Sequence, residues 1–105
     1  MILIHIIADT EDKAIEIADF LNKEKLILNS MILENVIIRK RLENGTAQST
    51  NQTLIMGKTK ALLFNTIDKK LREKFVDAMP ILYSIPIINM DWEQADELIK
   101  ETIPV

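Results

Sequence analysis

The spacing of hydrophobic and polar positions predicts four strands and three helices. Residues 1–9 form an almost continuous, isoleucine-rich apolar run that ends in the polar cluster 9–12, which is typical of a central strand buried on both faces. In residues 11–25 the apolar positions recur at helical spacing. This segment is therefore predicted to be a helix, with Asp9 or Thr10 as its cap.

A long antiparallel ribbon is predicted next. Residues 26–41 mix apolar and β-favouring side chains without the polar stripe of a surface helix, and Asn44 and Gly45 then tolerate the backbone of a tight hairpin turn. The second arm of the ribbon can extend through residues 61–64. Gly57 within this arm indicates a β-bulge or a close approach of another segment.

A second helix, an edge strand and a short last helix complete the chain. Thr66 is the predicted N-cap of the second helix, which has to end by Ala78 because Pro80 cannot continue it. Pro80 and Pro86 bracket an apolar segment and each removes a backbone donor, so this strand is expected at a sheet edge. Asp91 is expected to cap the last helix.

This order of elements predicts an α+β fold of the ferredoxin-like βαββαβ type: an antiparallel four-stranded sheet with two helices on one face, plus a short C-terminal helix. The 105 residues leave room for one domain, residues 1–105. The predicted strands carry apolar residues at both alternating positions, so the face without helices would expose a larger apolar patch than monomers tolerate. A symmetric homo-oligomer that covers this face is therefore expected.

Composition and charge exclude several classes of function. The net charge of −3 and the pI near 5.1 are opposite to the positive field of a general nucleic-acid binder. The chain has no cysteine and one histidine, which excludes disulfides, thiolate metal sites and histidine-rich cages. Its first residues carry no basic segment and are too short for a membrane span, so a cytoplasmic protein with no membrane partner is expected.

The side chains that could hold a metal each have a simpler interpretation. His5 is the only histidine of a chain without cysteine, so a hydrogen-bonded histidine in the core or at an interface is favoured over a ligand. Asp9, Glu11 and Asp12 cluster in one loop and could hold a hard cation such as Mg²⁺ or Ca²⁺. The same acidic residues suit the N-terminus of a helix, and this capping role is favoured.

Two groups of charged residues have structural alternatives as well. Glu34 lies among apolar residues on a strand. Either a structural pair with Lys58 on the adjacent strand or an edge-exposed charge is favoured over a catalytic role. Arg39 and Arg41, near the ribbon tip, could bind phosphate together with basic side chains of the second helix. A solvated, charged ribbon that blocks edge pairing is favoured, since the chain has two glycines and no glycine-rich phosphate loop.

Neither the aromatic residues nor the lone histidine indicates catalysis. Tyr83 and Trp92 combine an apolar body with a polar group, as interface aromatics do, although plain packing against the sheet is the favoured interpretation. His5 has no nucleophile elbow near it, and an acylphosphatase-like reaction would need a phosphate-binding loop where residues 8–12 are acidic. The protein is therefore not expected to be an enzyme.

Three segments, taken together, carry a resemblance to a known family. They are residues 16–26 (EIADFLNKEKL), residues 54–59 (LIMGKT) and residues 80–87 (PILYSIPI). In this order and at these separations they resemble the CutA family, small ferredoxin-like proteins associated with divalent-cation tolerance and related in fold to the PII signalling proteins. The resemblance implies a tight homotrimer in which strands of neighbouring subunits extend each other's sheets.

The chain departs from the family pattern at three places. Leu28 or Asn29 stands where the family usually has a cysteine. Residues 38–42 replace an aromatic pair near the ribbon tip, and residues 75–79 replace a His-Pro-Tyr sequence. The side chains best suited to a soft metal are therefore missing from these positions.

Two functions are consistent with these observations. The first is a non-catalytic, CutA-like homotrimer, involved in tolerance of or response to divalent metal ions, that binds a small ligand weakly between subunits. Its candidate cleft residues are Lys58, Tyr83, Trp92, Arg39 and Arg41. No cofactor other than a divalent cation is expected. The alternative is a PII-like regulatory module that binds a nucleotide or small metabolite and signals to a partner protein.

Overall fold

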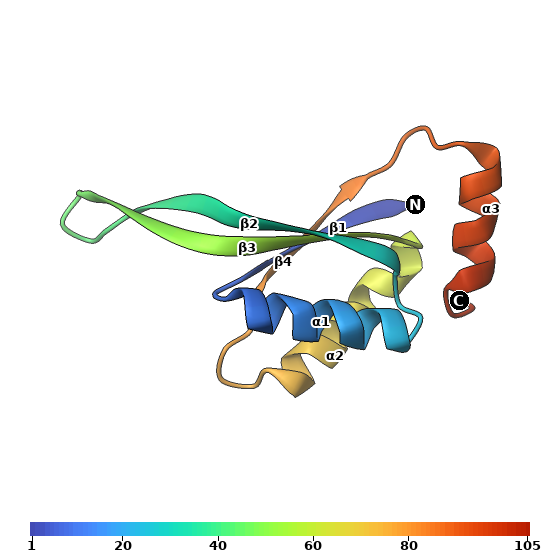
Figure 1. Cartoon of the computed structure of the whole chain (residues 1–105), viewed down its shortest axis with the longest axis horizontal. Coiled ribbons are helices and arrows are strands. Elements are labelled where there is room, and N and C mark those ends of the chain that lie inside the picture. Colours follow the sequence, from blue (N-terminus) through green and yellow to red (C-terminus); the bar gives the residue numbers. More distant parts are fainter.

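The computed structural model describes residues 1–105 and contains the predicted succession of strands and helices (Figure 1). In chain order the elements are β1 (Ile2–Ala8), α1 (Glu11–Lys23), β2 (Leu28–Arg41), β3 (Ala47–Thr59), the short 3₁₀ helix η1 (Ala61–Leu63), α2 (Phe64–Lys74), β4 (Ile81–Pro86) and α3 (Trp92–Glu101). The strands form one antiparallel sheet in the order β2-β3-β1-β4. This arrangement confirms the α+β, ferredoxin-like fold. None of the helices is long and apolar enough to span a lipid bilayer.

The hydrophobic core lies between one face of the sheet and the two helices α1 and α2 (Figure 1). Along β1 every second residue, from Ile2 to Ala8, is buried. The intervening residues of β1 are only half-buried because helices cover one face alone, so the expectation of burial on both faces is wrong. The central position of β1 is confirmed, since it pairs with both β3 and β4, whereas β4 is an edge strand as predicted.

Helix caps predicted from the sequence are present at α1 and α3. The Thr10 hydroxyl accepts a hydrogen bond from the Lys13 backbone N–H at 3.2 Å. The Asp91 carboxylate accepts one from the Gln94 backbone N–H at 3.1 Å. Both bonds satisfy donors that the first turn of a helix leaves free. The fully buried Leu98 then anchors α3.

The connection between β3 and α2 differs from the prediction. The helix η1 replaces the expected extension of the strand, and α2 begins at Phe64 without Thr66 as its cap. Leu63, Ile67 and Leu71 are all buried at four-residue spacing. The helical period therefore starts one turn earlier than Thr66 suggests, because this spacing places all three side chains on one face of a continuous helical segment.

The arms β2 and β3 continue beyond the rest of the sheet as a two-stranded ribbon (Figure 1). β2 has 14 residues and β3 has 13, whereas β1 has 7 and ends opposite Thr53. The loop at the tip, residues 42–46, is longer than the predicted tight turn. In this loop Gly45 has a φ angle of +87°, and Asn44 Oδ1 accepts a hydrogen bond from the Thr46 backbone N–H at 3.0 Å.

Gly57 lies where another segment comes close, as predicted. A Cβ atom added to it would lie 2.9 Å from Ile27 Cδ1 and 3.4 Å from the Asn29 carbonyl oxygen. The ladder is irregular at the same place, since the register of β2 with β3 shifts between Leu28 and Met31. The missing side chain of Gly57 thus makes room for the chain that enters β2.

We expect Gly57→Val to lower the free energy of unfolding by about 1–3 kcal/mol, because the new side chain overfills the space beside Ile27. Gly57→Ala adds only the Cβ atom and should cost less. Urea unfolding followed by circular dichroism measures both variants. A valine variant as stable as the parent would show that Ile27 moves aside without strain.

Candidate functional site

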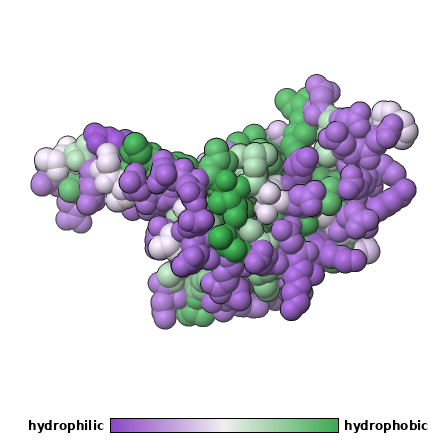
Figure 2. Space-filling model, viewed as in Figure 1, coloured by the Kyte–Doolittle hydropathy of each residue, from purple (hydrophilic) through white to green (hydrophobic).

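The sheet face opposite α1 and α2 carries side chains in rows that cross the strands, and we call it the open face. It consists of Leu3, His5 and Ile7 on β1, Met31 and Leu33 on β2, Leu54, Met56 and Lys58 on β3, and Ile81, Tyr83 and Ile85 on β4. One row is Leu33–Leu54–Ile7–Ile81. In Figure 2 hydrophobic side chains reach the surface in the middle of the molecule, next to the mostly hydrophilic ribbon.

Much of the open face is accessible to solvent in the single chain. Met31 is 61% exposed, Ile81 46%, Tyr83 43% and Leu33 42%. Monomeric proteins rarely leave contiguous apolar patches of several hundred Å² in water. The exposure therefore supports the expectation that another surface covers this face.

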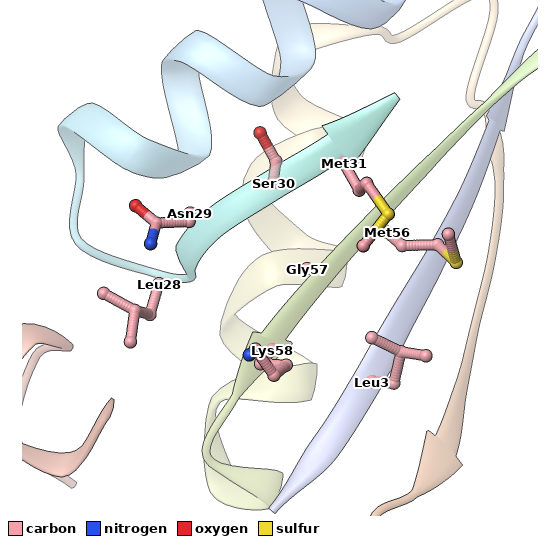
Figure 3. Close-up of a pocket in the computed structure, with 8 residues that line it drawn as sticks. All are labelled: Leu3, Leu28, Asn29, Ser30, Met31, Met56, Gly57 and Lys58. Carbon is pink, nitrogen blue, oxygen red and sulfur yellow. The ribbon is translucent and has the colours of Figure 1, made fainter. Parts of the chain in front are cut away.

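A cavity of about 240 Å³ opens on the open face beside the irregular start of β2 (Figure 3). It is lined by Leu3, Leu28, Asn29, Ser30, Met31, Met56, Gly57 and Lys58. Among these residues Lys58 is the only one with a charged side chain. The cavity thus combines aliphatic side chains and two thioethers with the polar groups of Asn29 and Ser30 and one ammonium group.

His5 lies on the open face and not in the core. It is half-buried, and its Nδ1 atom is hydrogen-bonded to the Tyr83 hydroxyl at 3.1 Å. The two rings are tilted by 59°, with centroids 5.1 Å apart. The prediction of a hydrogen-bonded histidine is confirmed, but its partner is the facing residue of the neighbouring strand β4.

Glu11 and Glu34 approach each other at the N-terminus of α1. They line a polar hollow of about 170 Å³ together with Asp9 and other polar residues. The Glu34 carboxyl raises the pKa of Glu11 above its ordinary value, first through a hydrogen bond and then through its negative charge. Burial and the charge of Asp12 act in the same direction.

Glu34 is an exposed charge, which is one of the two expectations, and the other, an ion pair with Lys58, is wrong. Lys58 lies opposite Leu28 in the register of β2 with β3. Glu34 instead lies at a second irregularity of the ladder, between Leu33 and Val36. Shifts of this kind change which residues face each other, so counting back from the ribbon loop does not give the partner of Glu34.

We expect Glu34→Gln to stabilise the protein increasingly as the pH rises from about 4 to about 7. In the parent, the raised pKa of Glu11 means that the folded chain binds more protons than the unfolded chain in this range. The stability due to Glu11 is therefore present at low pH and is lost as the pH rises through the folded-state pKa. Without the Glu34 charge, this loss should be smaller.

Urea unfolding of Glu34→Gln and the parent at a series of pH values measures this difference. Glu43→Gln, in the ribbon loop, is the matched control and should follow the parent at every pH. Identical pH profiles for Glu34→Gln and the parent would contradict the coupling between the two carboxyl groups.

The residues considered as metal ligands do not form a complete site within one chain. No three His, Cys, Asp or Glu side chains lie close enough together to hold a metal ion. Asp12 lies in the first turn of α1, where the helix dipole stabilises a carboxylate. His5 is not among the residues around the acidic hollow. A hard divalent cation bound at Asp9, Glu11 and Glu34 would need more oxygen ligands, from a second chain or from water.

The five candidate cleft residues lie in separate places in the single chain. Lys58 lines the cavity and Tyr83 binds His5 on the open face. Trp92 is 76% exposed at the start of α3. Arg39 donates a hydrogen bond to Ser49 Oγ at 2.7 Å within the ribbon, where Arg41 is also exposed. Any cleft that combines these residues has to form between chains.

Comparison with solved structures identifies proteins with the same fold. The divalent cation tolerance protein CutA1 of Thermus thermophilus superposes with a TM-score of 0.86 at 22% identity, covering 97% of this chain and 99% of that one. CutA1 of Oryza sativa gives a TM-score of 0.88 at 16% identity, covering 99% and 94%. The periplasmic divalent cation tolerance protein CutA of Archaeoglobus fulgidus gives 0.84 at 22% identity, covering 96% and 98%.

No protein-family model and no curated protein sequence matches the chain. The similarity to CutA proteins is therefore carried by the three-dimensional structure and extends over almost the whole length of both chains. The chain has the CutA fold, which confirms at the level of the fold the resemblance found in its three sequence segments.

Proposed function

We propose that this chain is a non-catalytic, divalent-cation tolerance protein of the CutA type, which assembles as a homotrimer and binds a small ligand weakly between its subunits. The observation that carries the proposal is the exposed, apolar open face on a CutA fold. The fold alone does not fix a function, because one fold hosts many sites. The open face adds a property of this chain itself, its solvent-exposed apolar side chains, and an assembly that covers them would explain it.

The edges of the sheet and the ribbon also favour an assembly. β2 and β4 are the outer strands of the sheet, and their free backbone groups can pair with strands of another copy. The ribbon beyond Thr53 pairs only within itself, and isolated two-stranded hairpins are marginally stable in water. Neighbouring copies that extend the sheet and support the ribbon would satisfy both requirements.

A cleft between subunits is the proposed binding place for the ligand. Lys58, Tyr83, Trp92, Arg39 and Arg41 are separated in one chain, and an assembly is what could bring them together. A divalent cation is the proposed ligand class, since the superposed proteins from T. thermophilus and A. fulgidus are described as divalent cation tolerance proteins. Because Lys58, Arg39 and Arg41 are cationic, their cleft suits a small anion instead. The cation would bind the carboxylates at the start of α1, which supply hard oxygen ligands.

The test is the solution mass of freshly purified protein by light scattering, with and without a metal chelator. We expect three times the chain mass of 12.1 kDa, unchanged by the chelator. A second arm compares growth of a CutA-deleted bacterial strain, with and without this chain, at graded concentrations of divalent metal salts. A monomeric mass would overturn the assembly, and equal growth curves would overturn the role in tolerance.

The basic ribbon favours a second candidate function, a PII-like regulatory module. Arg39, Lys40 and Arg41 are exposed near the end of an arm that projects from the body of the molecule (Figure 1). Such an arm can contact a partner protein while a nucleotide or small metabolite binds between subunits. A thermal-shift screen across nucleotides tests this candidate, and no shift at millimolar concentrations would count against it.

The cytoplasm is the proposed location of the protein. The superposed CutA of A. fulgidus is described as periplasmic, so the periplasm is the alternative to test. Fractionation of cells that express the full chain separates the two compartments. Recovery in the periplasmic fraction would overturn this location.

A further inference from the structure

The loop at the tip of the ribbon contains the only asparagine of the chain that is followed by glycine, Asn44 before Gly45. In such a dipeptide the backbone nitrogen of the glycine can attack the amide carbon of the asparagine side chain. The attack closes a five-membered imide ring and releases ammonia. Glycine favours this closure because it has no side chain to block the approach and because its backbone adopts the widest range of conformations.

The surroundings of the loop leave space for the ring. Asn44, Gly45 and Thr46 are exposed, and a Cβ atom added to Gly45 would lie more than 4 Å from every residue except its chain neighbours. One contact has to break first, because the Gly45 backbone N–H donates a hydrogen bond to the Leu42 carbonyl oxygen at 2.9 Å. Since the ribbon beyond Thr53 pairs only within itself, this bond can break without disturbing the rest of the sheet.

Thr46 polarises the amide that reacts. The Asn44 Oδ1 atom accepts two hydrogen bonds, one from the Thr46 backbone N–H at 3.0 Å and one from the Thr46 hydroxyl at 2.6 Å. Negative charge develops on this oxygen when the ring closes, and donors already placed at such an oxygen stabilise the transition state. Hydrogen bonds to an ionised acceptor are stronger than those to a neutral one, so both bonds should strengthen as the ring forms.

We propose that Asn44 is a site of covalent self-modification, at which the folded loop converts the side-chain amide into a carboxylate. Water is the only co-reactant. The reaction needs neither a metal ion nor a second copy of the chain, so the proposal goes beyond the function proposed above and does not depend on it.

The reaction has two steps, in which one water is consumed and one ammonia is released. In the first step Gly45 N loses its proton and forms a bond to Asn44 Cγ, while the bond from Cγ to Nδ2 breaks and Nδ2 takes up a proton and leaves as ammonia. In the second step water adds to one carbonyl carbon of the imide and breaks its bond to Gly45 N. Addition at Cγ gives aspartate, and addition at the backbone carbonyl carbon gives isoaspartate.

Both products change the end of the ribbon. Each adds one negative charge beside Glu43, in a loop that follows the basic residues 39–41. Isoaspartate also lengthens the backbone by one methylene group, so the hydrogen bond from Gly45 to the Leu42 carbonyl oxygen can no longer close the same turn. Because neither product returns to the amide, the modified fraction of the chains increases with the age of the protein.

Mass spectrometry of the full chain, incubated at neutral pH for several weeks, tests the site. Trypsin cuts after Arg41 and Lys58, so the peptide of residues 42–58 contains Asn44 together with Asn51. Asn51 is the internal control, since it is also exposed but lies within β3 and precedes a glutamine. We expect Asn44 to gain about 1 Da and to do so more than about 10-fold faster than Asn51.

Three variants separate the role of the loop from that of the dipeptide, and circular dichroism verifies that each is folded. Asn44→Gln keeps an amide but should not convert, because a longer side chain has to close a larger ring. Thr46→Val removes one donor with little change in shape and should slow conversion by about 3- to 10-fold, the rate effect of one hydrogen bond. Thr46→Ser keeps the hydroxyl and should convert like the parent.

Incubation in concentrated urea gives the reference without the folded loop, and there the parent and Thr46→Val should convert at the same rate. Two results would contradict the proposal. If Asn44 converted in urea but stayed intact in the folded chain, the loop would protect the dipeptide. If the folded parent converted no faster than folded Thr46→Val, the dipeptide alone and not the loop around it would cause the reaction.

Discussion

Replacing Leu33 and Ile81 by lysine is expected to leave the protein monomeric. Both residues belong to one cross-strand row, at its two ends, and both are more than 40% exposed in the single chain. Exposure in the monomer means that lysine costs little there. In the proposed assembly, however, each ammonium group would be buried against an apolar surface, which is strongly unfavourable without a partner charge.

Light scattering of Leu33→Lys/Ile81→Lys measures this effect, and circular dichroism verifies that the variant is folded. Val76→Lys is the matched control, since Val76 is 77% exposed between α2 and β4 and lies outside the open face. The control should keep the mass of the parent. If the double variant also kept it, the open face would not be the surface through which copies associate.

Leu21→Ala is expected to lower the free energy of unfolding by about 2–5 kcal/mol. Leu21 is fully buried where α1 packs on the sheet, and the shorter side chain leaves a cavity that the surrounding core fills only in part. For a chain of this size the loss corresponds to a fall in Tm of roughly 10 °C or more.

Leu62→Ala makes the same chemical change at a residue that is 76% exposed in η1. Its Tm should stay within a few degrees of the parent value. Differential scanning calorimetry of both variants has to use one protein concentration, because assembly makes Tm depend on concentration. A Leu21→Ala variant that melts with Leu62→Ala would contradict the position of the core.

Local patterns in the sequence predicted most of the fold. The caps Thr10 and Asp91, the close approach at Gly57 and the edge position of β4 each depend on one residue type in a short segment, so they were visible without the structure. The segment after Thr59 was predicted wrongly because a short apolar run has no clear period. Its helical conformation follows from burial against residues distant in the sequence.

Neighbours on the sheet could not be predicted to the same extent. The irregularities near Leu28 and Glu34 change which residues of β2 face β3. Gly57 indicates the first of them, but no local signal gives the size of either register shift. The contact of Glu34 with Glu11 was missed for this reason. One row of the open face crosses all four strands and consists of Met31, Met56, His5 and Tyr83. This row can be recognised only when the register of every strand pair is known.

The unequal lengths of the strands have a consequence for backbone dynamics. Amides of β1 are held by two neighbouring strands, whereas those of the ribbon beyond Thr53 have only the other arm. Hydrogen exchange at β1 should therefore follow global unfolding, and exchange at the ribbon should follow local opening. A neighbouring copy that covers the ribbon would slow local opening directly, whereas it would slow exchange at β1 only by stabilising the whole fold. Ribbon exchange that becomes slower with protein concentration would therefore report how tightly the copies associate.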